Sequence, residues 1–105
     1  MTTPTSTDTR RVYHRASLAA VRRELGPAST ALADAIDHAL AYTDQPRPDR
    51  LRPDPWHIHE LTNWAAKLTS ALHNPTIAAS RPRSAMVLTR LEAANWAIEQ
   101  LHTRP

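Results

Sequence analysis

The sequence contains no cysteine, no phenylalanine and a single glycine among its 105 residues. Without cysteine the chain has no disulfide, no thiolate metal site and no cysteine nucleophile, which fits a reducing compartment. A single glycine excludes a P-loop or dinucleotide fingerprint and argues against glycine-dependent hairpin turns. No apolar run approaches the roughly 20 residues that a transmembrane helix needs. These absences predict a small cytoplasmic protein with no membrane contact and no bound cofactor.

Apolar residues recur at helical spacing in four stretches. The predicted helices span about residues 9–25, 28–43, 55–73 and 84–102. Along the last stretch the apolar positions alternate steps of four and three, which is typical of a seam in a helical bundle. These positions are Val87, Leu91, Ala94, Ile98 and Leu101.

Residues between and before these stretches resemble connectors. Residues 1–8 are polar and lack apolar periodicity, so we expect a disordered tail before a single helical domain at 9–105. The segment 44–55 holds four prolines and alternating charges, which predicts an extended connector. Ser84 is the expected N-cap of the last helix. The sequence therefore predicts an all-α fold: a small antiparallel four-helix bundle of two α-hairpins joined by a Pro-rich loop.

The segment DPWHIHELTNW, residues 54–64, places two histidines one residue apart beside a glutamate. On a helix His57 falls within the apolar stripe and His59 lies roughly 200° away, so the two cannot bind one metal ion. Asp54 and Pro55 are typical of a helix N-terminus, which favours a structural interpretation. His14 also falls on an apolar face, so a metal or proton-transfer site formed by His14 and His57 is the weakest of three hypotheses.

Basic residues gather on the first predicted helix. Between positions 10 and 23 the chain has five arginines and no acidic residue, within a net charge of +3. The five candidates for binding nucleic acid or another anion are Arg10, Arg11, Arg15, Arg22 and Arg23. The second helix has no Arg or Lys, so contact with phosphates is favoured over base readout. The alternative is a solvated face whose charges pair with nearby acidic side chains.

A second candidate surface surrounds Trp96. On the helical wheel Trp96 lies roughly 180° from the apolar seam, beside small or apolar residues. Aromatic residues dominate protein interfaces, which favours a partner-binding strip. Its members are Trp96, Met86, Thr89 and Ala93. The alternative is that another part of the same chain packs over Trp96.

No serine or other nucleophile lies in a catalytic sequence pattern. We therefore predict a non-enzymatic interaction or regulatory protein that binds a protein partner, or itself as a homo-oligomer, through helix faces. The alternative hypothesis is a nucleic-acid-associated protein that uses the arginines of the first helix. The sequence leaves open the partner, the pathway, the oligomeric number and whether His14 and His57 are adjacent.

Overall fold

A computed structural model describes residues 6–25, 30–44 and 55–102, and each regular element in these ranges is a helix. The helices are α1 (Ser6–Glu24), α2 (Thr30–Asp44), α3 (Pro55–Leu72), α4 (Pro75–Ala78) and α5 (Arg81–His102). This confirms the predicted all-α fold. Among the described residues, no helix has both the length and the apolar character needed to cross a membrane.

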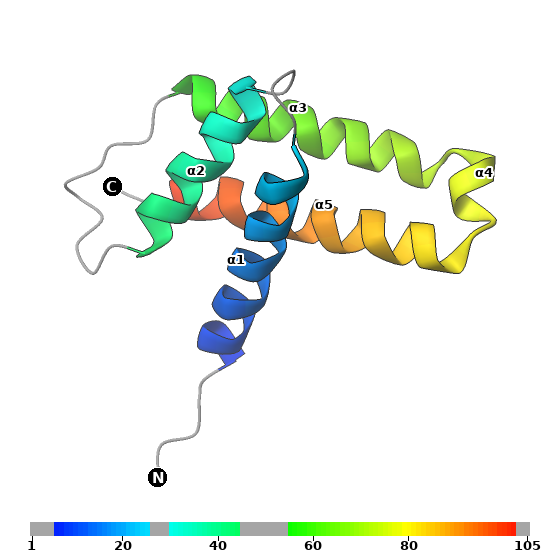
Figure 1. Cartoon of the computed structure of the whole chain (residues 1–105), viewed down its shortest axis with the longest axis horizontal. Helices are drawn as coiled ribbons and strands as arrows, with labels where there is room; N and C mark the ends of the chain where they lie inside the picture. Colours follow the sequence, from blue (N-terminus) through cyan, green and yellow to red (C-terminus); the bar gives the residue numbers. More distant parts are fainter. Residues whose placement is uncertain (1–5, 26–29, 45–54, 103–105) are drawn as a thin grey trace, which may run out of the picture.

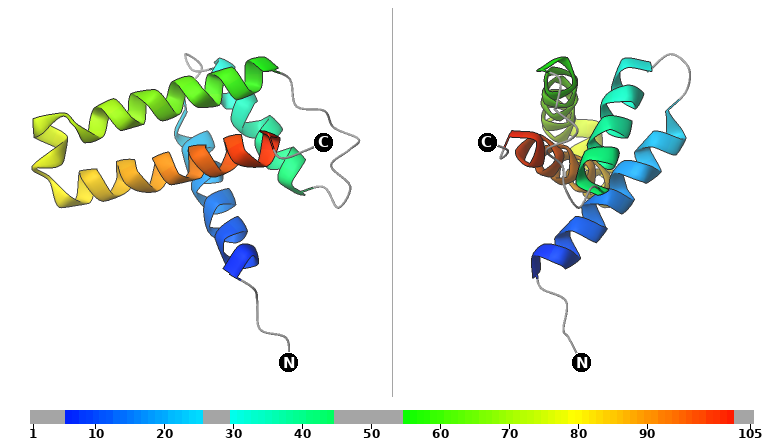
Figure 2. Two further views of the ribbon diagram at one scale, coloured as in Figure 1. Left: turned by 180° about the vertical axis from the view of Figure 1, so that it is seen from behind. Right: turned by 90° about the vertical axis from the view of Figure 1, so that its left-hand side faces the viewer.

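The helices form two hairpins in two layers. α3 and α5 run antiparallel, and the single turn α4 lies at the tip between them (Figure 1). α1 and α2 form the second hairpin and lie together on one side of the first (Figure 2). The α1–α2 pair crosses the α3–α5 pair steeply instead of aligning with it, as a regular four-helix bundle would. It covers the end of the α3–α5 hairpin that lies away from α4.

The core lies where the two layers cross. Its largest fully buried side chains are Leu18 of α1, Ile36 of α2 and Leu61 of α3, one from each of three helices. α5 contributes small residues, among them the fully buried Ala93 and Ala97. Because the distance between packed helices depends on the side chains at the contact, these alanines permit a close approach to α5. The apolar periodicity therefore identified a buried face on each of the four predicted helices, and α5 also buries a second side, with Ala93, Trp96 and Ala97, outside the predicted seam.

The N-terminal boundary of the helical domain differs from the prediction, whereas the last helix ends at His102 as predicted. α1 begins at Ser6, so residues 6–8, expected in a disordered tail, are its first turn. Extending an existing helix by one turn is inexpensive because only nucleation is strongly unfavourable. Residues 1–5, 26–29, 45–54 and 103–105 lie outside the described residues, and they include most of the segment predicted as a Pro-rich connector. Asp54, the expected N-cap of α3, lies there too, whereas Pro55 is the first residue of α3 as predicted.

The predicted start of the last helix is wrong. α5 begins at Arg81, three residues before the expected N-cap, because Pro82 is compatible with a first helical turn. Ser84 lies inside the helix, and its hydroxyl donates a 2.8 Å hydrogen bond to the carbonyl of Ile77 in α4. The segment expected to be a loop also contains α4, which Asn74 caps by accepting a hydrogen bond from the Thr76 amide.

Candidate functional site

His14 and Trp96 hold α1 against α5. The His14 ring is stacked on the Trp96 indole, with ring centroids 5.6 Å apart and planes inclined by 27°. His14 is 5% exposed and Trp96 is 7% exposed, so each covers the other from solvent. Tyr13 meets the His14 ring edge-on, with centroids 5.4 Å apart, and is itself half exposed. This contact, called the joint between α1 and α5, is therefore buried between the two layers, and Tyr13 forms its solvent-exposed edge.

Burial lowers the pKa of His14 below its ordinary value of 6.5, and the positive charge of Arg10 acts in the same direction. The carboxylate of Glu92 on α5 opposes this shift. The buried Nδ1 atom of His14 has no hydrogen-bond partner among the described residues. The neutral imidazole is therefore the form that this joint accommodates.

The predicted helical geometry of the HIHE segment is confirmed. His57 is buried in α3, whereas His59 is exposed and lies 3.2 Å from the Asn63 side-chain nitrogen. The His57 ring stacks on His38 of α2, with centroids 4.2 Å apart and planes inclined by 9°. His14 instead stacks on α5, so the structure does not bring His14 and His57 together. The His38 contact was missed because His38 lies at the flank of the α2 apolar stripe.

Within the described ranges, no group of three or more His, Asp or Glu side chains is arranged to hold a metal ion. The rings of His38 and His57 stack face to face. The Trp56 ring also packs on His57, with ring centroids 4.0 Å apart. Ring stacking directs the apolar faces toward each other, whereas metal ligation requires in-plane nitrogen lone pairs to converge. This cluster joins α2 to α3 and has the geometry of packing.

Two of the five arginines on α1 bind α2. Arg15 donates 3.2 Å hydrogen bonds to the Thr43 hydroxyl and to the carbonyl of Leu40, in the last turn of α2. The Thr43 hydroxyl also donates a 3.3 Å hydrogen bond to the Leu40 carbonyl, so Arg15, Thr43 and Leu40 form one hydrogen-bonded group near the C-terminal end of α2. Arg22 forms a salt bridge with Asp37, and its Nε lies 3.0 Å from each carboxylate oxygen. These two side chains match the alternative in which charges on α1 serve the fold.

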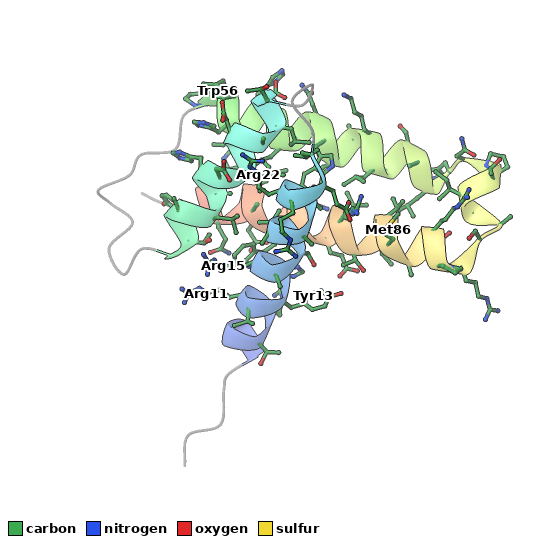
Figure 3. The ribbon with its side chains drawn as sticks, in the orientation of Figure 1. Arg11, Tyr13, Arg15, Arg22, Trp56 and Met86 are labelled. Carbon is green, nitrogen blue, oxygen red and sulfur yellow. The ribbon has the colours of Figure 1, made fainter. Side chains whose placement is uncertain are left out.

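The other three arginines remain exposed on α1, and they are Arg10, Arg11 and Arg23. Figure 3 shows Arg11 and Arg15 extending from α1 on the side where α2 lies, and Tyr13 extending on the other side. Glu24 of α1 forms an ion pair with Arg90 of α5, so its negative charge is not available only to the arginines of α1. The predicted basic surface is therefore reduced from five free cationic groups to three.

The predicted partner-binding strip is divided by burial. Trp96 and Ala93 are buried, and Thr89 is half-buried with its hydroxyl bonded to the Ala85 carbonyl at 2.9 Å. Met86 is 46% exposed. In the single chain Trp96 and Ala93 are thus unavailable to a partner, because α1 packs over them. The helical wheel correctly placed Trp96 away from the seam, but it contained no information on which helix covers that side.

Large apolar side chains remain exposed at five described positions, and they are Val12, Tyr13, Trp56, Met86 and Leu88. Met86 lies on the part of α5 that extends beyond α1 toward α4 (Figure 3). It belongs to a stripe at helical spacing with Arg90, Ala93 and Ala97, of which the two alanines are fully buried. The stripe therefore runs out from beneath α1 and ends in an uncovered apolar side chain.

A corresponding stripe runs along α3. His57, Leu61 and Trp64 are buried, and His57 contacts α2. Leu68 and Ala71 continue the stripe at the same spacing and are only half-buried.

Comparison with protein-family profiles, with curated proteins and with solved structures finds no match to this chain. The candidate site therefore rests on this geometry: two stripes that begin under α1 and α2 and continue onto the uncovered part of the hairpin.

Proposed function

We propose that the chain is a non-enzymatic interaction module that binds a protein partner through the uncovered part of the α3–α5 hairpin. We call this surface the open face, and it comprises Lys67, Leu68, Ala71, Arg83 and Met86. The observation that supports it most strongly is the exposure of Met86, 46%, at the end of a stripe that α1 buries elsewhere. Arg90 separates Met86 from the buried alanines of this stripe, so Met86 is the uncovered apolar side chain that α5 contributes. Exposed apolar side chains that gather on one surface are typical of interaction sites.

Its chemistry suits a protein contact. Methionine is unbranched and polarisable, so it adapts to the shape of a partner surface. Lys67 and Arg83 are both exposed, and each lies at helical spacing from a stripe, three residues from Trp64 and Met86 respectively. We assign them to the polar rim of the open face. An apolar centre with a polar rim is the usual composition of a protein interface. A second copy of the chain and a different protein both satisfy this description.

The proposal predicts that Met86→Glu weakens partner binding strongly while the fold survives. A carboxylate in the centre of an apolar contact costs on the order of 2 kcal/mol, which is about a thirtyfold loss of affinity. Leu88 provides a matched control, because it is 47% exposed on the same helix but lies about 160° around it from Met86. The tagged chain and both variants would be compared for proteins captured from the cells that make it.

Proteins retained by Leu88→Glu and lost with Met86→Glu are the expected result. Size exclusion with light scattering on the same three proteins separates self-association from binding of another chain. Equal capture by Met86→Glu and the unaltered protein would refute the open face as the binding surface. Circular dichroism melting shows whether each variant is folded, and we expect all three curves to agree within a few degrees.

A second candidate function is contact with the phosphates of nucleic acid by α1. The specific observation in its favour is that Arg10, Arg11 and Arg23 are exposed along one helix. If α1 binds duplex DNA, replacing Arg10 and Arg11 by Ala should reduce the slope of log affinity against log salt by about two. Arg22→Ala is the control, since that side chain is bonded to Asp37. Affinity that does not change with salt would exclude this function.

A further inference from the structure

The open face lies in a stretch of sequence with charge of one sign. Residues 61–91 contain no aspartate or glutamate, and their Lys and Arg residues are Lys67, Arg81, Arg83 and Arg90. Arg90 is bonded to Glu24 of α1, whereas the other three are exposed. The acidic residues of the chain lie outside this stretch, so the half of the hairpin that extends away from α1 and α2 is cationic.

The other half of the same hairpin already shows what kind of element fits it. There helices cover the two stripes: on α3, His57 lies against His38 of α2, and on α5, Trp96, which flanks the buried Ala93 and Ala97, lies against His14 of α1. Both stripes continue at unchanged spacing past the edge of this cover, which the bond between Arg90 and Glu24 marks on α5. The grooves between side chains of two adjacent helices accept the ridge of another helix. The open face therefore offers a continuation of a helix-binding surface.

From these two observations we infer that the open face binds an acidic amphipathic helix of a partner protein. Its apolar side packs on Leu68, Ala71 and Met86, and its carboxylates lie beside Lys67 and Arg83. Amphipathic helices bind grooves in this manner through apolar anchors at spacings of three and four residues. Complementary charges at the rim accelerate association and reject partners of like charge. The inference rests on the proposed function and specifies the partner that the open face selects.

Charge complementarity and the apolar stripe together favour this partner over nucleic acid. Phosphates would pair with Lys67 and Arg83 but would leave Met86 and Ala71 without an apolar counterpart. The charge pattern also disfavours a symmetric dimer through the open face, because such a dimer would place Lys67 and Arg83 of two copies close together.

The test uses the full chain and two synthetic 18-residue helical peptides. Both peptides carry leucine at the same apolar positions, and one has glutamate and the other lysine at the remaining exposed positions. We expect the acidic peptide to bind at least about tenfold more tightly than the basic one in fluorescence anisotropy at low salt. Met86→Glu should weaken the acidic peptide by about tenfold or more. Arg83→Gln should weaken it about two- to fivefold.

Arg81→Gln is the matched control for Arg83→Gln. Both side chains are exposed arginines in the first turn of α5, but Arg81 shares the helix side of Leu88, seven residues further on. Equal losses with both variants would show a general charge effect and overturn the assignment to the open face. Equal or tighter binding of the basic peptide, or no binding of the acidic peptide below about 1 mM, would overturn the inference.

Two further measurements distinguish a wrong partner class from a wrong binding surface. A short DNA duplex and vesicles with anionic headgroups are each titrated against the chain. If one of them binds, if Arg83→Gln but not Arg81→Gln removes that binding, and if the acidic peptide has no effect, then that ligand and not an acidic helix occupies the open face. If Met86→Glu still abolishes capture of cellular proteins while the acidic peptide fails to bind, the charge class is wrong and the proposed function stands. If Met86→Glu changes neither measurement, both are wrong.

Discussion

Trp96→Ala is expected to destabilise the protein by about 3–5 kcal/mol, the range found for removing a buried aromatic side chain. The indole is 7% exposed and stacks on His14, so its loss opens a cavity at the joint of α1 and α5. Domains of this size have total stabilities of about 5–15 kcal/mol, so the variant should be partly unfolded at moderate temperature. Denaturation in urea followed by circular dichroism measures the change.

Met86→Ala on the same helix is the control, and its free energy of unfolding should stay within about 0.5 kcal/mol of the unaltered protein. This contrast distinguishes the two members of the strip that the sequence placed together. If Trp96→Ala were as stable as Met86→Ala, the indole would not be a core side chain, and the original assignment of Trp96 to a partner surface would regain its basis.

Acidification is expected to weaken the joint between α1 and α5 through His14. The folded protein lowers the pKa of His14 below 6.5, so the unfolded chain takes up the proton first as the pH falls. The contribution to stability is complete above pH 6.5, declines as the pH falls below it, and levels off below the folded-state pKa. Each unit by which the pKa is lowered corresponds to about 1.4 kcal/mol.

The groups that act on His14 are Arg10 of α1 and Glu92 of α5. His14→Phe keeps an aromatic ring beside Trp96 and cannot bind a proton, so its stability should fall less between pH 7 and pH 5. Urea midpoints at the two pH values, with exposed His59→Gln as a control that retains the full decline, measure the difference. Identical declines in His14→Phe and the unaltered protein would show that another group is responsible.

Periodicity in the sequence predicted the buried faces because burial of a helix requires apolar residues at spacings of three and four. Leu18, Ile36 and Leu61 each lie in such a pattern in the sequence and are fully buried. Helix ends were less predictable. Pro82 was taken as part of a loop, although a proline is acceptable in the first turn of α5. Whether Pro82 lies in a loop or in the first turn of a helix depends on the neighbouring turn α4, which the local sequence does not reveal.

The candidate sites were harder to predict because they depend on contacts between distant residues. A wheel shows that Trp96 points away from the seam of its helix and that Arg15 lies on the rim of the apolar stripe of α1. It does not show that α1 covers Trp96 or that Thr43 accepts a hydrogen bond from Arg15. Two members of the predicted strip therefore became core, and Met86 alone is exposed. The continuation of the apolar stripes past α1 follows only from the steep crossing of the two hairpins.

The most direct test of the open face is photocrosslinking in the cells that make the protein. A photoreactive amino acid replaces Met86 in one variant and Leu88 in another, two positions with nearly equal exposure on opposite sides of α5. The account predicts that position 86 crosslinks to a discrete protein and that position 88 does not. The same crosslinked protein from both positions, or from position 88 alone, would contradict it.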